Sequence, residues 1–368
     1  MPKRIDSLYL HFPFCSHLCN YCDFYKKVPQ NKTLDYQKYH DYLESSFLVH
    51  KNLIEKYGYS WSPLKTFYIG GGTPSLWGKE GKIFLQNFLN EKNIQLDPEC
   101  EFTLEVNPGA WDEEVLSQWR SLGVNRFSLG VQSLQKEMIT YLDRIHSIED
   151  VYTTLEYFRD NKLNFSVDFM LGLPFSKEYK RDVIKELQIA LSYNPNHFSV
   201  YILTVKDNYT HFNNLPDEEW VEHEFLLVAD FLKANGFEHY EVSNFSRPKK
   251  QSEHNLNYWR SHSVAALGPS ATGFLFEDRL RYKWKPNQPE IELEFLTEEE
   301  FNLEKIYMAI RSQVGLNMDD FPKSLEGVVI NWKEKLLVTE ENKIIKLTSK
   351  GYLLLDSLMN DLFLLKLV

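Results

Sequence analysis

Two kinds of segment alternate along the first 236 residues of the chain. Short apolar runs that end at Gly, Pro or polar residues predict buried β-strands. Between them lie longer segments with apolar residues at helical spacing, such as Tyr39, Leu43, Phe47 and Ile54. The predicted strands are residues 8–12, 66–69, 101–106, 125–131, 165–170 and 198–203. The predicted helices are residues 34–57, 79–89, 112–122, 134–161, 177–192 and 217–234.

Six strand–helix units with short turns are typical of a parallel sheet that is covered by helices. Six units, rather than the eight of a complete TIM barrel, predict an α/β fold with a partial (β/α)6 TIM-like barrel. Ligand sites of such sheets lie at the carboxyl ends of the strands. The unusual clusters of cysteine, glycine and polar residues all follow strands, so we expect them to converge on one site.

The alternating pattern ends after Gly236. Beyond it the sequence predicts a strand (237–245), a basic loop (247–250), a turn of small residues (267–273) and a linker (286–289). The tail predicts a helix (299–314), two short strands (335–338 and 343–347) and a second helix (349–364), an order that suggests a small winged-helix-like α+β domain. We therefore expect a barrel in residues 1–236, an extension in 237–290 and a C-terminal domain in 291–368.

The balance of charges narrows the choice of partners. Asp and Glu outnumber Lys and Arg by 52 to 41, which gives a formal charge of −11. Phosphate contacts need a basic face, so we expect no nucleic-acid partner. No apolar run is long enough to span a bilayer, and the N-terminus carries no apolar signal segment. We therefore expect a cytoplasmic protein, for which only peripheral contact with a membrane stays open.

Three of the four cysteines lie in one loop after the first predicted strand, as Cys15, Cys19 and Cys22. Thiolates this close together can hold a soft metal or an iron–sulfur cluster. A zinc site with His11 or His17 as the fourth ligand is an alternative, and so is a loop of unligated thiols. The remaining cysteine, at position 100, is solitary and fits a buried core position.

A glycine run, Gly70-Gly71-Gly72, followed by Thr73-Pro74, comes after the second predicted strand. Residues without side chains let the backbone approach a ligand closely. A phosphate loop is disfavoured because no Gly-Lys-Ser/Thr follows, and a purely structural turn is the remaining alternative. Polar residues, namely Glu105, Gln132 and Asp168, occur in or at the ends of later strands. A carboxylate at position 168 alternates with apolar neighbours, so we expect it in a polar interior.

Taken together, these clusters resemble the radical S-adenosylmethionine (SAM) family over nearly the whole chain. In that family three thiolates at this spacing hold a [4Fe–4S] cluster whose open iron chelates the amine and carboxylate of SAM. One-electron reduction then cleaves SAM to methionine and a 5′-deoxyadenosyl radical. The resemblance implies cluster ligands at Cys15, Cys19 and Cys22. It implies SAM contacts at Tyr9, Tyr21, Gly71, Gly72, Thr73, Glu105, Gln132, Arg144 and Asp168, with Tyr201 as a further candidate. Asp143, directly before Arg144, departs from the glycine that relatives usually carry there.

Within this family the chain resembles the branch that contains oxygen-independent coproporphyrinogen III oxidases and HemW-type heme chaperones. The oxidases carry a further cysteine two residues after the motif, and here that residue is Phe24. The segment His254-Asn255-x-x-Tyr258-Trp259 resembles the HNxxYW motif of the chaperones. It implies an axial heme ligand at His254, with Tyr258 and Trp259 flanking the macrocycle. A loop-anchoring role for these side chains is the alternative.

The basic loop that precedes this motif adds Arg247, Lys249 and Lys250 as candidates to face heme propionates. Two residues differ from those frequent in relatives, namely Glu253, directly before the motif, and Thr272, in the turn of small residues.

The resemblance therefore implies a radical SAM protein that binds heme and delivers it to an apoprotein, with a small electron-donor protein as a second partner. It implies the ability to cleave SAM and leaves open whether cleavage is coupled to heme transfer. Radical decarboxylation of coproporphyrinogen III, as in porphyrin biosynthesis, is the alternative function.

Overall fold

The computed structural model describes residues 3–206, 209–321 and 324–364. A nine-stranded sheet forms its centre, in the order β7-β8-β6-β5-β4-β3-β2-β1-β9. Strands β1 to β6 are parallel neighbours in chain order, as expected for a partial (β/α)6 barrel. They are β1 (Lys3–Phe12), β2 (Tyr59–Gly71), β3 (Leu96–Val106), β4 (Arg126–Gln132), β5 (Phe165–Leu171) and β6 (His197–Ile202).

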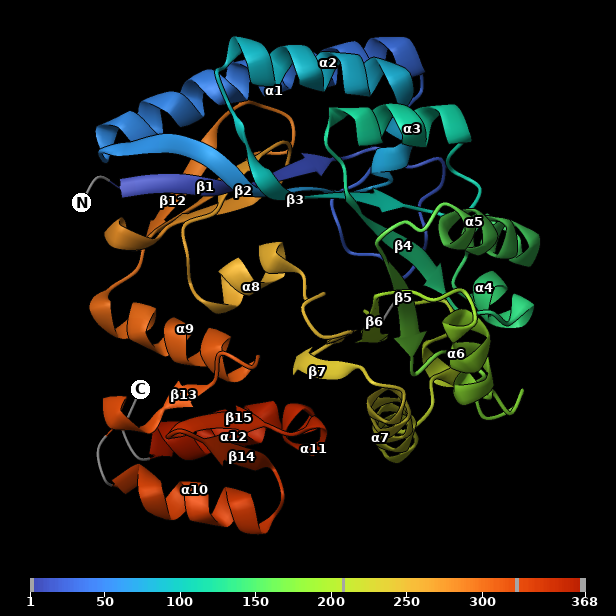
Figure 1. The fold of residues 1–368 in the computed structure, drawn as a ribbon, viewed down its shortest axis with the longest axis vertical. Coiled ribbons are helices and arrows are strands. Elements are labelled where there is room, and N and C mark those ends of the chain that lie inside the picture. The colour runs from blue at the N-terminus through green and yellow to red at the C-terminus, as the bar shows by residue number, and fades with distance from the viewer. Residues whose placement is uncertain (1–2, 207–208, 322–323, 365–368) are drawn as a thin grey trace.

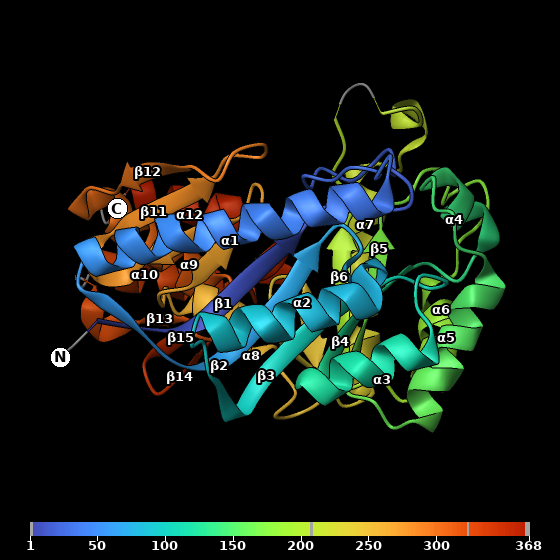
Figure 2. The same cartoon turned by 90° about the horizontal axis from the view of Figure 1, so that it is seen from above.

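Helices cover the outer face of this curved sheet, as Figures 1 and 2 show. They are α1 (Lys32–Lys56), α2 (Gly78–Glu91), α3 (Glu113–Leu122), α4 (Lys136–Tyr141), α5 (Ile148–Asp160), α6 (Val183–Leu191) and α7 (Glu218–Ala234), with a short 3-10 helix at Pro74–Trp77. The chain therefore alternates between strand and helix in the order that the hydrophobic pattern predicts.

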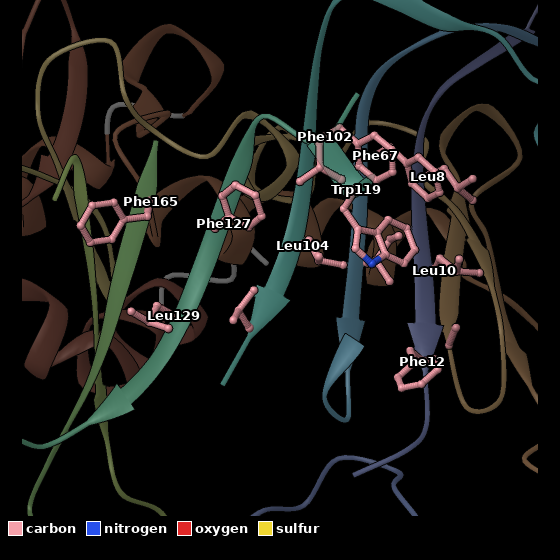
Figure 3. Close-up of a cluster of buried hydrophobic side chains, with 14 of the residues drawn as sticks. Leu8, Leu10, Phe12, Phe67, Phe102, Leu104, Trp119, Phe127, Leu129 and Phe165 are labelled. Carbon is pink, nitrogen blue, oxygen red and sulfur yellow. The ribbon is translucent and has the colours of Figure 1, made fainter. Parts of the chain in front are cut away.

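Side chains of the parallel strands divide by polarity between the two faces of the sheet. The outward positions are apolar and pack with Trp119 of α3 in one buried cluster (Figure 3). On β1 these positions are Leu8 and Leu10, whereas Ser7 and Tyr9 lie on the other face. Successive residues of a strand point to opposite faces, so the helices cover the apolar side and the polar side lines the barrel interior.

The long helix predicted over 134–161 is two helices, α4 and α5, because the backbone turns between them. Asp143 adopts a left-handed conformation with φ of 52°, which a helix interior does not tolerate. Ser147 then caps α5 through a capping box with Asp150. The helix predicted over 177–192 likewise begins only at Val183.

A buried ion-pair cluster links the segments that follow β4 and β5. Arg181 lies between Glu186, at 2.8 Å, and Glu224, at 3.5 Å. Glu186 accepts a 2.5 Å hydrogen bond from Ser133, just after β4. Glu224 accepts a 2.8 Å hydrogen bond from the backbone N–H of Gly172, just after β5. The cluster therefore holds two strand ends at the carboxyl edge in fixed positions.

The extension adds strands at both edges of the central sheet and a helix on its concave side. The strand predicted over 237–245 is a hairpin of two antiparallel strands, β7 (Glu238–Glu241) and β8 (Asn244–Ser246), and β8 pairs with β6. At the other edge β9 (Ala265–Leu267) pairs in parallel with β1. The HNxxYW segment forms α8 (Glu253–Trp259), which lies inside the curve of the sheet (Figure 1).

The region that was predicted to be a linker belongs to a second, antiparallel sheet. This sheet consists of β10 (Thr272–Leu275), β11 (Leu280–Trp284) and β12 (Ile291–Phe295). Residues 286–289, predicted as a linker, are part of the turn between the paired strands β11 and β12. The proline content that suggested a linker is equally typical of a hairpin turn.

The C-terminal residues form a small α+β unit with its own hydrophobic cluster. Its antiparallel sheet has the order β13-β15-β14, from β13 (Leu316–Asn317), β14 (Val338–Glu341) and β15 (Ile344–Leu347). Its helices are α9 (Glu298–Ile310), α10 (Ser324–Glu334), α11 (Ser349–Leu353) and α12 (Leu355–Leu364). A small helical unit with an antiparallel sheet was predicted, although α10 was not. In the described part of the chain, no helix combines the length and hydropathy that a membrane crossing requires.

Candidate functional site

The cysteine loop leaves the end of β1 and folds back on itself. The backbone N–H of Cys15 donates to the carbonyl of Lys27 at 3.0 Å, and that of Lys27 donates to Pro13 at 2.8 Å. Cys15 is buried, whereas Cys19 and Cys22 are partly exposed. The loop is therefore closed at its base and presents its three thiols within one short stretch of backbone.

The glycine run of β2 fixes this loop from the side. The backbone N–H of Gly72 donates to Phe12 at 2.7 Å, and that of Thr73 donates to Phe14 at 2.8 Å. A Cβ atom on Gly72 would lie 2.5 Å from the carbonyl oxygen of Phe14, and one on Gly71 would lie 2.5 Å from the His11 ring. The absence of side chains thus lets the glycine run pack directly against the cysteine loop.

The three thiols line one cavity of about 370 Å³. Burial raises the pKa of the Cys15 and Cys19 thiols, while Thr73, whose hydroxyl lies 3.6 Å from the Cys15 sulfur, opposes the shift at Cys15. Thiols held in this way become thiolates when a cationic group binds them. Among the residues that the structure describes, no three His, Cys, Asp or Glu side chains surround a single ion position.

The zinc alternative depends on His11 or His17 as a fourth ligand. The His11 ring contacts the carbonyl of Tyr25 at 2.8 Å and the hydroxyl of Tyr9 at 3.1 Å, and it does not line the cavity. His17 does line the cavity. Its Nε2 lies 2.9 Å from Asp143, which is ion-pair distance, although the two groups are not aligned for a hydrogen bond.

A second cavity, of about 390 Å³, adjoins the first at the carboxyl ends of the strands. The two cavities share part of their lining, namely Tyr21, Cys22, Gly71, Gly72, Thr73, Asn107 and Arg144. The second cavity adds Glu105 from β3, Gln132 from β4, Asp168 from β5 and Tyr201 from β6. The structure thus brings the predicted cluster residues and most of the predicted SAM residues around one continuous space.

Glu105 is oriented by two hydrogen bonds. The Tyr68 hydroxyl donates to its Oε1 at 2.9 Å, and the Gly71 N–H donates to its Oε2 at 3.0 Å. Burial, assisted by the nearby Asp168, raises the pKa of this carboxyl to about 7. The group therefore changes charge close to neutral pH.

Asp168 lies inside the barrel among hydroxyl groups, as its strand position predicts. Ser128 donates to it at 3.0 Å and Ser166 at 3.2 Å. Burial raises its pKa, and these hydroxyls, with that of Ser199, oppose the rise. These donors satisfy the buried carboxyl group without a cation. A carboxylate has about four acceptor positions, so Asp168 can still accept from a further donor in the cavity.

Gln132 stands at the end of β4 in a strained conformation. Its φ of 68° lies in the left-handed region, which is uncommon for a residue other than glycine. Such a conformation costs on the order of 1–3 kcal/mol and tends to occur at functional sites. From this position Gln132 lines the second cavity.

Arg144 bridges the two cavities. Its guanidinium donates to Asn107 at 2.8 Å, to the carbonyl of Gly130 at 2.7 Å and to the Tyr21 hydroxyl at 3.4 Å. The departure at Asp143 has a local reason, since its φ of 52° favours glycine but is tolerated by aspartate. The turn that carries Arg144 is therefore kept in this chain despite the missing glycine.

Tyr9 lies away from both cavities, under the carboxyl edge of the barrel. Its ring lies 6.1 Å from the Tyr68 ring and 6.4 Å from the His254 ring, measured between centroids. Any contact between Tyr9 and a ligand in the second cavity would therefore pass through its neighbours.

The predicted heme residues lie on α8, and His254 is only 1% exposed. Its Nδ1 lies 3.0 Å from the Thr66 hydroxyl, and its Nε2 lies 3.4 Å from the Tyr258 hydroxyl. The Trp259 ring faces Arg311, whose guanidinium carbon is 5.5 Å from the ring centroid. In this conformation the His254 ring is an anchor for α8, and it reaches a heme iron only if α8 moves.

Sequence reasoning missed Asn107 and Tyr68. Asn107 also donates to Thr73 at 2.9 Å, so it joins the glycine run to Arg144. Asn107 directly follows β3, and this position at the carboxyl edge of the sheet was a usable signal. Tyr68 shares the inward face of β2 with Gly70, and the period-2 alternation of a strand places it there.

The donor set and the shape of the site fit a cluster with a bound cofactor. Three thiols line the first cavity, and the second cavity offers carboxyl, amide and guanidinium groups beside it. Cysteine thiolates hold [4Fe–4S] clusters, and the polar groups suit a ligand that carries both an amine and a carboxylate.

Comparison with known proteins shows the family of this chain. Residues 9–187 match the family model of the radical SAM superfamily. This class of protein implies a [4Fe–4S] cluster and SAM. The heme chaperone HemW of Bacillus subtilis is 31% identical to this chain over 379 residues, which cover 95% of this chain and 97% of the relative. HemW of Lactococcus lactis is 31% identical over 96% of each chain. The chain therefore belongs to the HemW family of radical SAM proteins.

A likeness to a solved structure supports the fold. Coproporphyrinogen III oxidase (HemN) from Escherichia coli matches with a TM-score of 0.76 over 98% of this chain and 90% of that chain. The two sequences are 22% identical, so this likeness concerns the fold alone.

Proposed function

We propose that this protein binds heme and delivers it to a recipient apoprotein in the cytoplasm, as a radical SAM heme chaperone. The observation that carries the proposal is the similarity to proteins named heme chaperone HemW, which runs along nearly the full length of both chains. The similarity includes the extension and the C-terminal unit as well as the barrel, so the whole architecture supports the proposal.

In this proposal Cys15, Cys19 and Cys22 hold a [4Fe–4S] cluster, which a small electron-donor protein reduces. Glu105, Gln132, Arg144 and Asp168 bind SAM, in the cavity that adjoins the thiols. A reduced cluster of this kind supplies an electron for the cleavage of SAM. Arg144 orients the two ligands relative to each other, because it lines both cavities and is itself fixed by Asn107.

Radical decarboxylation of coproporphyrinogen III is the second candidate, because the sequence motifs resemble the oxidases of this family as well as the chaperones. Phe24 counts against it. This residue stands where the oxidases carry a further cysteine, and its side chain lines the second cavity without any group that exchanges a proton or an electron.

A paired assay on anaerobically cluster-loaded protein distinguishes the two functions. We expect a Soret band that saturates on titration with heme, and no loss of coproporphyrinogen III in the presence of SAM and a reductant. Conversion of coproporphyrinogen III to a vinyl product would establish the second function instead. Absence of any saturable heme binding would reject the chaperone proposal.

A further inference from the structure

Three exposed apolar side chains surround the opening of the second cavity. Phe24 is 68% exposed, Tyr201 43% and Ile202 38%, and all three line this cavity. Phe24 comes from the cysteine loop, whereas Tyr201 and Ile202 end β6. Single exposed apolar residues are normal on a protein surface, but three around one opening mark a candidate interaction site. We call Phe24, Tyr201 and Ile202 the rim.

The loop segments that carry the rim also meet through a pair of charges. Lys206, which follows β6, lies 2.7 Å from Asp23, and both side chains are largely exposed. Figure 2 shows the segment after β6 beside the loop after β1, near the upper end of the view. An exposed ion pair contributes little stability, so Lys206 can exchange Asp23 for an anionic group of a ligand at low cost.

The rim differs in chemistry from the rest of the cavity. The inner wall of the cavity carries the ionisable groups of Glu105, Asp168 and Arg144. These groups suit a ligand that is itself zwitterionic. The rim exposes two aromatic rings and one aliphatic side chain to solvent, and the cation of Lys206 pairs with Asp23, the neighbour of Phe24. This combination matches a ligand with a wide planar apolar face and carboxylates at its edge.

We propose that the rim binds one face of heme, with Lys206 opposite a propionate. The proposal rests on the proposed heme-chaperone function and places its cargo at the barrel opening. Heme reaches the rim without any change in the fold. Access to His254, in contrast, requires α8 to give up the contacts of that ring with Thr66 and Tyr258.

This placement couples the two ligands. A macrocycle on the rim covers the opening through which SAM enters and leaves, so bound heme slows the exchange of SAM. Coupling between equilibrium affinities is reciprocal, so any change that SAM causes in heme affinity is matched by an equal effect of heme on SAM affinity.

The test is a heme titration of cluster-loaded full-length variants, followed at the Soret band. We expect Phe24→Ala to weaken heme binding about tenfold through the lost ring contact, and Phe24→Trp to restore it. Lys206→Ala should weaken binding about threefold, as for a partly exposed charge contact. Phe295→Ala is the matched control, because Phe295 is an aromatic residue that is 55% exposed on β12. Lys65→Ala, which breaks an exposed pair with Asp6, is the control for Lys206.

The outcomes separate this proposal from the function on which it rests. Wild-type affinity in both Phe24→Ala and Lys206→Ala would overturn the rim as the heme site. So would a loss that is equal in Phe295→Ala, because that pattern indicates adsorption to any exposed aromatic group. Loss of binding in His254→Gln alone, with an unchanged melting temperature, would place heme at α8. A wild-type protein that binds no heme at all would instead reject the proposed function itself.

Discussion

The hydroxyl of Tyr68 donates a 2.9 Å hydrogen bond to the carboxyl group of Glu105. The two residues lie on neighbouring strands, β2 and β3, and the second carboxyl oxygen accepts from Gly71. The bonds fix the carboxyl group beside the glycine run, where the cluster cavity and the second cavity meet. Burial nevertheless raises the pKa of Glu105 to about 7.

This relationship predicts that SAM binds more tightly as the pH rises from 6 to 8. Below pH 7 the Glu105 carboxyl is mostly protonated and neutral, and above it the carboxylate attracts the positive charges of SAM. Equilibrium dialysis of SAM against cluster-loaded protein should show this dependence in the wild type and lose it in Glu105→Gln. Tyr68→Phe removes a bond that lowers the pKa and should shift the dependence to higher pH. An unchanged pH profile in Glu105→Gln would show that another group controls binding.

The burial of Glu241 predicts that the stability of the fold, rather than the binding of a ligand, depends on pH. It is buried at the end of β7, its Oε1 has no hydrogen-bond partner among the described residues, and burial raises its pKa to about 7. A folded-state pKa above the unfolded value means that the stabilisation is complete below about pH 4.5 and is lost as the pH rises through 7. We expect the free energy of unfolding to fall by at most about 1.4 kcal/mol per pH unit over this window from this group.

Urea unfolding at pH 5.5 and 7.5 checks this prediction. Glu241→Gln should flatten the pH dependence and stabilise the protein at pH 7.5, where the wild-type carboxylate is charged and buried. The charge of Arg311 opposes the rise in the pKa of Glu241, so Arg311→Leu should steepen the dependence. Equal slopes in the wild type and Glu241→Gln would contradict the assignment.

We expect the substitution of Arg181 to cause a large loss of stability. Its removal leaves Glu186 and Glu224 buried without their common cation. Breaking a buried pair in this way costs about 3–5 kcal/mol, and Arg181→Met should therefore show a much lower midpoint in urea. Lys177→Met, which removes a partner of Asp217 on the surface, should change the stability by less than about 1 kcal/mol.

The strands of the barrel could be predicted because their signal is local. Runs such as residues 165–170 carry the whole pattern of a buried strand in a few positions. The beginning of β2 was missed, because Ser60, Ser62, Pro63 and Lys65 interrupt the apolar pattern. Residues 237–245 were predicted as one strand rather than as the hairpin of β7 and β8, because the turn contains no Gly or Pro and only Ser243 and Asn244 favour it.

The sequence singled out most of the residues that line the two cavities, but not the contacts among them. Spacing and position indicated the thiols and the polar residues at strand ends, whereas the family resemblance added Tyr21 and Arg144. Tyr9, also named from the resemblance, lines neither cavity. The bond between Asn107 and Arg144 joins residues 37 positions apart, and no local pattern encodes it. The burial of His254 likewise results from the packing of α8 against β1 and β2, which a heptad or strand pattern does not reveal.

The backbone conformation at Asp143 predicts that glycine is tolerated at this position and that a β-branched residue is not. Its φ of 52° suits glycine, so Asp143→Gly should change the free energy of unfolding by less than about 1 kcal/mol. Asp143→Val should cost about 1–3 kcal/mol, because a β-branched side chain is strained at positive φ. Thermal unfolding of both variants checks the order. Equal stability of the two would show that the turn before Arg144 relaxes freely.

Both SAM binding and the proposed heme delivery depend on a [4Fe–4S] cluster held by Cys15, Cys19 and Cys22. Anaerobic reconstitution followed by iron and sulfide analysis should give about four of each per chain in the wild type and in Cys100→Ala. Cys15→Ala, Cys19→Ala and Cys22→Ala should each lose the cluster and its broad visible absorbance. Zinc in place of iron in the wild type, or iron retained in all three variants, would contradict the account.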